Sequence, residues 1–313
     1  PTSLSIAFAA MIAFAAWIAL TAFWSQIPGA EWLGLTILVA VLGAGALVHE
    51  ASSAPPRRVR KMASCYVAMA ILAAAMMLFE GKSGGYLRGV LPPQDLSPLR
   101  SKDLVAIGRG ITAMAPLVFP AIVLLRRMSG SWIVAIAPAV TLFAAATEFS
   151  IFSNVIGLAC GALAFAAAWR RPQLAIKILA VVIIASLLLA PFAAAQISAS
   201  TILDGDAGFL PASWAQRLVI WRYAADVTFD QCMPFGCGAD YARFLSRDAA
   251  TVVIPGWPFP LQVMPIHPHN LFLQVWLELG LPGVLALAIA MVFSVRALHL
   301  VRIEPPSIAA ICA

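Results

Sequence analysis

Two histidines close to an apolar run are the residues best suited to chemistry in this chain. His267 and His269 flank a proline, and Asn270 follows them directly before the run begins. An imidazole changes its charge near neutral pH, so either ring could take or give a proton in a reaction. We therefore expect His267 and His269 to belong to a functional site.

Three polar residues continue this pattern into the apolar run. Asn270, Gln274 and Glu278 are spaced four residues apart and share one face of a helix. Polar side chains at bilayer depth are costly, so this face must point into protein or water rather than lipid. We expect the two histidines to look into the same cavity as this face.

Composition defines the class of protein that must position these residues. The chain is 62% hydrophobic and only 11% charged, with a mean hydropathy of +0.93, whereas an ordinary domain has about 25% charged residues. Such a chain is predicted to be an all-α polytopic membrane protein with about eight transmembrane helices. The apolar runs are roughly 4–24, 32–48, 62–80, 104–125, 131–147, 151–169, 174–195 and 271–295.

Basic residues mark every second junction between these runs. Arginine pairs or clusters occur near residues 57–61, 126–127, 170–171 and 296–302. The positive-inside rule makes these junctions cytoplasmic and puts residues 196–268 on the outer side. The net charge of +6 is then a consequence of topology, which disfavours a nucleic-acid-binding surface.

The predicted organisation has four parts. Seven transmembrane helices with short loops occupy 1–195, and a large periplasmic loop with an amphipathic helix near 213–228 occupies 196–270. An eighth transmembrane helix covers 271–297, and 298–313 resembles the start of a truncated further helix. We therefore expect the sequence to be a fragment. The first run has neither the basic start nor the cleavage pattern of a signal peptide.

The large loop contains an apolar stripe at helical spacing, formed by Trp214, Leu218, Trp221 and Ala225. A helix of this kind suits the headgroup region of a membrane. Arg217 and Arg222 flank the stripe, and guanidinium groups bind phosphate oxygens in pairs. Two interpretations stay open: binding of an anionic lipid head, or ordinary anchoring at the interface.

Arg109 is a further candidate, in the sequence Gly108-Arg109-Gly110 near the outer end of the fourth run. An arginine at this depth can snorkel to the interface. The flanking glycines permit close helix approach and favour an arginine turned into the bundle.

The cysteines show no metal-ligand spacing, and no metal or cofactor is expected. Cys232 and Cys237 both lie in the large loop, where a disulfide between them is one of two open alternatives.

Several of these motifs together resemble the O-antigen ligase and O-antigen polymerase superfamily. The most specific block is His269-Asn270 followed by Gly280-x-x-Gly283. Upstream, Trp214-x-x-Arg217-Leu-x-Ile-Trp221 and Pro234-x-Gly236-x-Gly238 resemble the large periplasmic loop of the family. The Gly108-Arg109-Gly110 motif is similar to one in many alphaproteobacterial members. The resemblance covers about residues 100–295.

The resemblance implies a GT-C-like membrane glycosyltransferase of the bacterial inner membrane, with its site facing the periplasm. Such enzymes take a glycan from undecaprenyl diphosphate and move it to the lipid A core (ligases) or to another lipid-linked glycan (polymerases). Arg217 matches the loop arginine expected to hold the diphosphate, with Arg109 and Arg222 as weaker candidates. His269 matches the motif histidine, a candidate general base, and His267 is the alternative.

One departure concerns the diphosphate site. Many members carry an arginine after a serine near the outer end of the sixth run, where this chain has Ser153-Asn154. Either Arg109 compensates or the diphosphate is held differently.

The implied chemistry needs no metal, because fixed arginines can stabilise the leaving diphosphate while a neutral histidine accepts the acceptor's proton. We predict inversion at the anomeric carbon. Ligase and polymerase stay open, and so do a polysaccharide or lipid transporter and a structural membrane protein, for which substitution of His269 or Arg217 would leave the phenotype intact.

Overall fold

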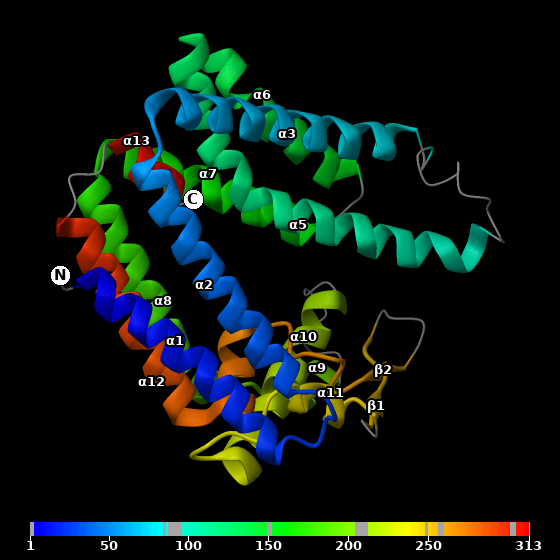
Figure 1. Cartoon of the computed structure of the whole chain (residues 1–313). Helices are drawn as coiled ribbons and strands as arrows, with labels where there is room; N and C mark the ends of the chain where they lie inside the picture. Colours follow the sequence, from blue (N-terminus) through cyan, green and yellow to red (C-terminus); the bar gives the residue numbers. More distant parts are fainter. Residues whose placement is uncertain are drawn as a thin grey trace. The chain divides into compact units, whose positions relative to one another are not determined.

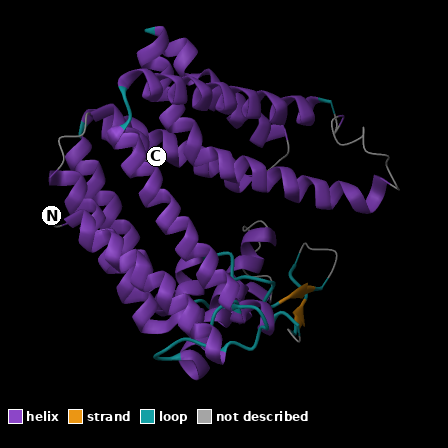
Figure 2. Ribbon diagram, viewed as in Figure 1, coloured by secondary structure: helices purple, strands orange, loops and turns teal. Residues whose placement is uncertain are grey.

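The computed structural model of the chain describes residues 3–83, 86, 96–148, 152–203, 212–247, 250–255, 260–300 and 305–312. Helices dominate these residues, and the paired strands are two residues each (Figure 2). The elements are α1 (Ser3–Thr21), η1 (Ala22–Trp24), α2 (Glu31–Ser53), α3 (Pro56–Lys82), α5 (Leu96–Ser129), α6 (Trp132–Glu148), α7 (Phe152–Arg170), α8 (Pro172–Ala194), α9 (Ala199–Leu203), α10 (Ala212–Val227), η2 (Thr228–Cys232), α11 (Tyr241–Leu245), β1 (Thr251–Val252), β2 (Leu261–Gln262), α12 (Leu271–Leu300) and α13 (Pro305–Cys312).

The chain divides into two compact units. The first, which we call the loop unit, comprises residues 1–49 and 180–300. The second, which we call the bundle unit, comprises residues 50–179 and 301–313. Helices α2 and α8 each contribute to both units.

Six helices in the described part of the chain are long and apolar enough to cross a membrane: Ser5–Trp24, Pro56–Lys82, Gly108–Ser129, Phe152–Arg170, Pro172–Ala194 and Leu271–Leu298. Two further apolar helices, Glu31–Leu47 and Trp132–Glu148, are shorter. The all-α polytopic class is therefore confirmed. The two shorter helices fall on runs that the sequence predicted to span.

The loop unit is built on α1 and α12, which run side by side (Figure 1). Their interface buries Ile18, Val275 and Leu279. The indole Nε1 of Trp276 donates to the carbonyl of Leu187 at 2.7 Å, which ties α12 to α8. These contacts make α12 the central helix of the unit.

Helix α10 covers the segment where the sequence predicts an amphipathic helix. Its buried face is formed by Ala215, Val219, Ile220 and Ala224, which pack on other parts of the loop unit. Of the predicted stripe, Ala225 is also buried, Leu218 and Trp221 are partly buried, and Trp214 is exposed. The predicted stripe therefore lies largely against the loop unit, with Trp214 at its exposed end.

The bundle unit packs by apolar side chains from α3, α5, α6 and α7. Its core includes Ile111, Val118 and Leu142, all fully buried. A cavity of about 340 Å³ between α5, α6 and α7 is lined by Phe119, Ile122, Ile136, Ala139, Val140, Phe143, Leu158, Ala159, Ala162 and Phe165.

Candidate functional site

Helix α12 is broken at Gly280, whose φ of 60° and ψ of −160° are not helical. The sequence explains the break, because glycine adopts positive φ readily and Pro282 has no N–H to donate to the carbonyl of Glu278. A break inside an apolar helix leaves backbone groups that must find partners elsewhere. The kink is therefore a polar spot in an apolar helix.

Residues 234–240, which we call the clasp, supply those partners. Three backbone hydrogen bonds join the clasp to α12. Their donor and acceptor pairs are Leu281 N to Pro234 O (2.8 Å), Cys237 N to Leu277 O (2.9 Å) and Gly238 N to Glu278 O (3.0 Å).

Glycines let the two backbones come this close. A Cβ on Gly236 would lie 2.4 Å from the carbonyl oxygen of Glu278, and a Cβ on Gly280 would lie 2.3 Å from the carbonyl oxygen of Pro234. At Gly283, a Cβ would lie 2.3 Å from the Cβ of Leu279. One glycine from each sequence motif, Gly236 and Gly280, thus lies at the contact between the two backbones, where any side chain would collide with backbone atoms.

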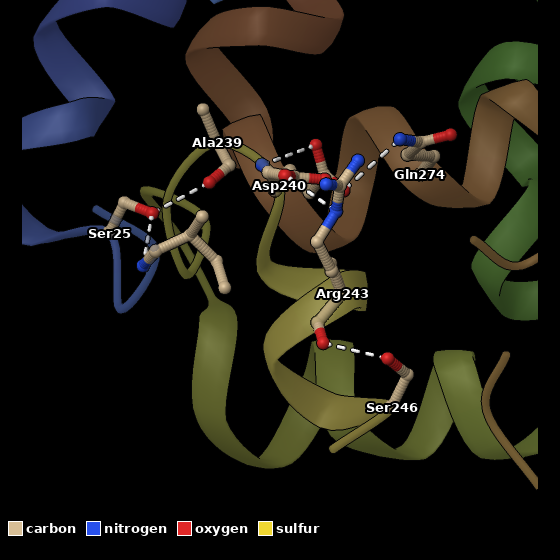
Figure 3. A network of polar contacts seen from close by, with 8 residues as sticks. Ser25, Ala239, Asp240, Arg243, Ser246 and Gln274 are labelled. Carbon is tan, nitrogen blue, oxygen red and sulfur yellow. Dashed lines mark hydrogen bonds and ion pairs between the residues drawn. The ribbon is translucent and has the colours of Figure 1, made fainter. Parts of the chain in front are cut away.

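Residues at the end of the first apolar run hold the other side of the clasp. The hydroxyl of Ser25 donates to the carbonyl of Ala239 at 2.7 Å (Figure 3). The hydroxyl of Thr21 accepts the N–H of Ala239 at 3.2 Å, and Trp24 Nε1 donates to the carbonyl of Gly236 at 3.1 Å. Their spacing in the sequence does not indicate this role, since polar groups at the end of an apolar run are typical of any membrane interface.

Glu278 is buried, with 4% of its surface exposed, and both of its carboxylate oxygens are used. Oε2 accepts the N–H of Asp240 at 3.0 Å, and Oε1 accepts Gln274 Nε2 at 3.1 Å (Figure 3). Asp240 pairs in turn with Arg243 at 3.0 Å. Glu278 therefore anchors the end of the clasp, and Gln274 supports its carboxyl group.

Cys232 and Cys237 form a disulfide, which resolves the alternative that the sequence left open. Cys232 ends η2, which continues directly from α10, and Cys237 belongs to the clasp. The N–H of Gly236 also donates to the carbonyl of Cys232 at 2.6 Å. The disulfide thus fastens the end of α10 to the clasp.

The histidine turn sits at the start of α12. Asn270 Oδ1 accepts the N–H of Phe272 at 3.0 Å and that of Leu273 at 3.3 Å, as a helix N-cap does. His269 has a left-handed backbone with φ of 54°, and Trp221 Nε1 donates to the carbonyl of Pro268 at 3.1 Å. Helix α10 therefore holds the turn that presents the histidine.

The environment of His269 keeps its imidazole neutral. The ring centroids of His267 and His269 are 4.2 Å apart, and the backbone N–H of His269 donates to the imidazole Nδ1 of His267 at 3.2 Å. Partial burial of the ring, followed by His267 and the positive charge of Arg217, lowers the pKa of His269 to about 4. A neutral ring at pH 7 is the form that accepts a proton.

The two arginines of α10, Arg217 and Arg222, have different surroundings. Arg222 donates to Asp226 at 2.9 Å and to the carbonyls of Ala195 and Ile197 at 2.5 and 3.3 Å, so it ties α10 to the end of α8. Among the residues that the structure describes, none forms a hydrogen bond or ion pair with the guanidinium of Arg217. This leaves Arg217 as the loop arginine with donors available beside His269.

Arg109 belongs to the bundle unit and is exposed on α5, so the prediction that it turns into the bundle is wrong. The close approach at its flanking glycine is used by Met77, whose terminal methyl carbon would lie 2.8 Å from a Cβ on Gly110. Asn154 Nδ2 donates to the carbonyl of Gly108 at 3.0 Å. The polar residue that stands in place of the family arginine thus contacts the turn that bears Arg109.

No set of three or more histidine, cysteine, aspartate or glutamate side chains within the described ranges is arranged to hold a metal ion. The candidate site comprises His269 and His267 on the turn that Trp221 holds, with Arg217 near enough to act on His269 electrostatically.

These features define a helical membrane protein with a large loop folded onto a broken apolar helix. The chain belongs to the O-antigen ligase family, whose family model matches residues 115–288. The match includes the histidine turn, the clasp and the kink.

Curated relatives agree with this assignment. The chain is 28% identical over 141 residues to a candidate polysaccharide ligase of Rickettsia typhi, and 29% identical over 142 residues to one of Rickettsia prowazekii. Each match covers 45% of this chain and 34% of the relative, so the chain matches about a third of the length of these proteins. No solved structure matches the chain.

Proposed function

We propose that the protein, in its full-length form, transfers a glycan from undecaprenyl diphosphate to an acceptor hydroxyl, as an O-antigen ligase. The observation that carries the proposal is the hydrogen bond from Trp221 to the carbonyl of Pro268, which places the α10 face that bears Arg217 next to the turn that bears His269. The charge of Arg217 also helps to lower the pKa of the imidazole. The guanidinium of Arg217 suits the diphosphate leaving group, and the imidazole of His269 suits the proton of the attacking hydroxyl. Both residues lie within the family match.

Arg217 is proposed to bind the diphosphate. Its guanidinium can donate to two phosphate oxygens at once and stays charged at any working pH. Exposed apolar side chains flank the pair, with Trp214 near Arg217 and with Ile266 and Leu271 on either side of the histidines. A charged pair with an apolar rim suits a substrate that joins an anionic head to a hydrocarbon chain.

His269 is proposed to accept the proton of the acceptor hydroxyl. The acceptor oxygen attacks the anomeric carbon, the bond from that carbon to the diphosphate oxygen breaks, and the configuration inverts. The diphosphate leaves with the bonding electron pair, held by Arg217, and the proton passes to His269 and then to solvent. Charge stabilisation of this kind replaces a metal in the proposed step.

Binding of the donor would strengthen the base. A diphosphate on Arg217 neutralises the positive charge that helps to lower the pKa of His269. The pKa of His269 then rises toward the ordinary value of 6.5, so the imidazole gains proton affinity when the leaving group is in place. The site is thus a better base with the donor than without it.

The fold and location extend the same proposal. A GT-C-like arrangement in the bacterial inner membrane, with the histidine turn facing the periplasm, would meet lipid-linked donors where they are presented. The acceptor is then the lipid A core or a growing glycan. The polymerase is the alternative within this proposal, since the same pair of residues serves either acceptor.

Complementation with the full-length gene tests the function. Hosts that lack an O-antigen ligase or a polymerase would receive the wild type, His269→Asn or Arg217→Gln at matched membrane expression, with Arg247→Gln as a control loop arginine. Rescue by wild type and control but neither site variant is expected, and the rescued host names the acceptor. Rescue by both site variants would refute the site, and a purified product with retained configuration would refute the mechanism.

A further inference from the structure

Helix α10 is fastened to α12 at two separate places. Near its middle, the indole of Trp221 holds the carbonyl of Pro268, directly before His269. Beyond its end, the Cys232–Cys237 disulfide joins it to the clasp, which bonds to the kink of α12. One fastening is at the start of α12 and the other is at its break.

The surface between the two fastenings is apolar. Ile220 and Ala224 of α10 belong to the same buried cluster as Leu273 and Leu277 of α12. Apolar contacts are non-directional and do not by themselves fix how far one helix has slid along another. Hydrogen bonds with narrow distance and angle ranges do fix it.

The register between the helices determines where Arg217 stands. Arg217 lies four residues before Trp221 and therefore on the same face of α10. Its distance from His269 depends on how α10 lies along α12. At the C-terminal end of α10, the hydrogen bonds from the clasp to α12 fix the position of one helix along the other.

We propose that the Cys232–Cys237 disulfide and the clasp are a positioning device, which sets the register of α10 on α12 and so holds Arg217 beside His269. This inference rests on the proposed function for the meaning of that pair. Glu278 is a positioning residue in the same device, because its carboxylate holds the N–H of Asp240 at the end of the clasp.

Small changes in this register have large consequences for a reaction. A displacement of about 1 Å between reacting groups can lower the rate by about 10²-fold. The disulfide is therefore expected to matter for catalysis although it lies outside the histidine turn.

A distance measurement tests the register without any need for activity. Spin labels attached through ketone-bearing residues at positions 214 and 266, both exposed in the structure, would report the separation of the two halves of the site in the full-length protein. A narrow distance distribution is expected for the parent. A broad or displaced distribution is expected for the double variant Cys232→Ser and Cys237→Ser, whereas Cys65→Ser with Cys160→Ser, which replaces two free cysteines, should match the parent.

Transfer kinetics on the unlabelled proteins give the second measurement. We expect kcat to fall at least about tenfold in the double serine variant. The acid limb of kcat/KM should also move to higher pH, because Arg217 no longer helps to lower the pKa of His269. If the variant only unfolded more easily and kept the register, the fraction of active enzyme would fall but the acid limb of kcat/KM would stay at the same pH.

Backbone variants keep the test decisive if the serine variant fails to fold. Gly236→Ala places a Cβ against α12 with the disulfide present, and Gly43→Ala is the matched control, since nothing lies within 4 Å of its new Cβ. A distance distribution that is unchanged in the disulfide and Gly236 variants would overturn the proposal, as would an altered one with full transfer activity. A parent without glycan transfer would refute the proposed function, while the distances would still decide whether the disulfide fixes the register.

Discussion

The helices of the loop unit and the helices of the bundle unit are packed by different kinds of contact within each unit. In the loop unit, side chains from one helix bond to the backbone of another over long sequence distances, as Trp17 Nε1 does to the carbonyl of Leu279 at 2.8 Å. Bonds of this kind also occur in the bundle unit, as from Asn154 Nδ2 to the carbonyl of Gly108, but there α5, α6 and α7 meet mainly through apolar side chains around an apolar cavity. Apolar packing tolerates substitution as long as volume is conserved, whereas backbone hydrogen bonds specify one geometry. The unit with the specified geometry is the one that carries the histidine turn.

The reason for the difference is the break in α12. In an unbroken apolar helix, the backbone N–H and C=O groups form hydrogen bonds within the helix and need no partners from neighbouring elements. Gly280 and Pro282 interrupt that pattern, so the clasp and the end of α1 must complete it. A broken helix thereby becomes the element that fixes the loop in place.

The largest expected effect comes from placing a side chain in that junction. Gly280→Ala should lower the stability by at least about 2 kcal/mol, because a Cβ would meet the clasp backbone and the positive φ is strained. Gly157→Ala in the bundle unit has open space for its Cβ and should stabilise α7 or leave it unchanged. Apparent melting temperatures in detergent would compare the two. Equal temperatures would remove the distinction between the units.

The next effect separates chemistry from structure at the histidine turn. Asparagine tolerates the left-handed backbone of position 269 but cannot act as a base, so His269→Asn should fold normally and lose about 10²- to 10⁴-fold in kcat. In His267→Asn, the amide oxygen can still accept the N–H of His269, so a much smaller loss is expected. Initial rates of glycan transfer would measure both. The reverse order would make His267 the base.

A smaller effect concerns the charge of the site. Because Arg217 helps to lower the pKa of His269 from 6.5 to about 4, Arg217→Gln should raise it. The pKa should stay below 6.5, since burial of the ring, the largest cause, remains. Inorganic diphosphate should act in the same direction on the parent. The pH dependence of diethylpyrocarbonate modification at His269, followed by mass spectrometry, would report these shifts, and an unchanged pKa would separate Arg217 from the histidine.

Much of this arrangement follows from the sequence, and its limits have physical reasons. Hydropathy predicts the helical class, and the spacing of His269, Gly280 and Gly283 indicates the family. The docking of the clasp on the kink is a long-range backbone contact, which side-chain periodicity does not encode. A Gly-x-Pro sequence inside an apolar run is the signal that could have indicated the break.

Residues with local roles were the hardest to interpret. Asn270 caps α12 and Glu278 holds the clasp, yet a polar stripe on an apolar helix looks the same whether it lines a cavity or satisfies a neighbour. Alanine gives a weak hydrophobic signal in a sequence, so the buried Ala215 and Ala224 of α10 did not stand out beside the tryptophans of the predicted stripe.

The smallest expected effect comes from a comparison of two carboxyl groups, Glu278 in the loop unit and Glu148 in the bundle unit. Glu278→Gln keeps one oxygen to accept the N–H of Asp240 but turns an amide NH2 toward Gln274, so one of the two hydrogen bonds is weakened, which should cost about 1 kcal/mol. Lys82→Gln breaks the ion pair with Glu148 in the bundle unit, where the lysine is mostly exposed and water screens the charges. That change should cost no more than about 0.5 kcal/mol. Thermal unfolding of matched samples would compare the stability of the two variants. A larger loss of stability for Lys82→Gln than for Glu278→Gln would contradict the comparison of the two units, because a buried carboxyl group with two partners would then contribute less than a screened surface pair.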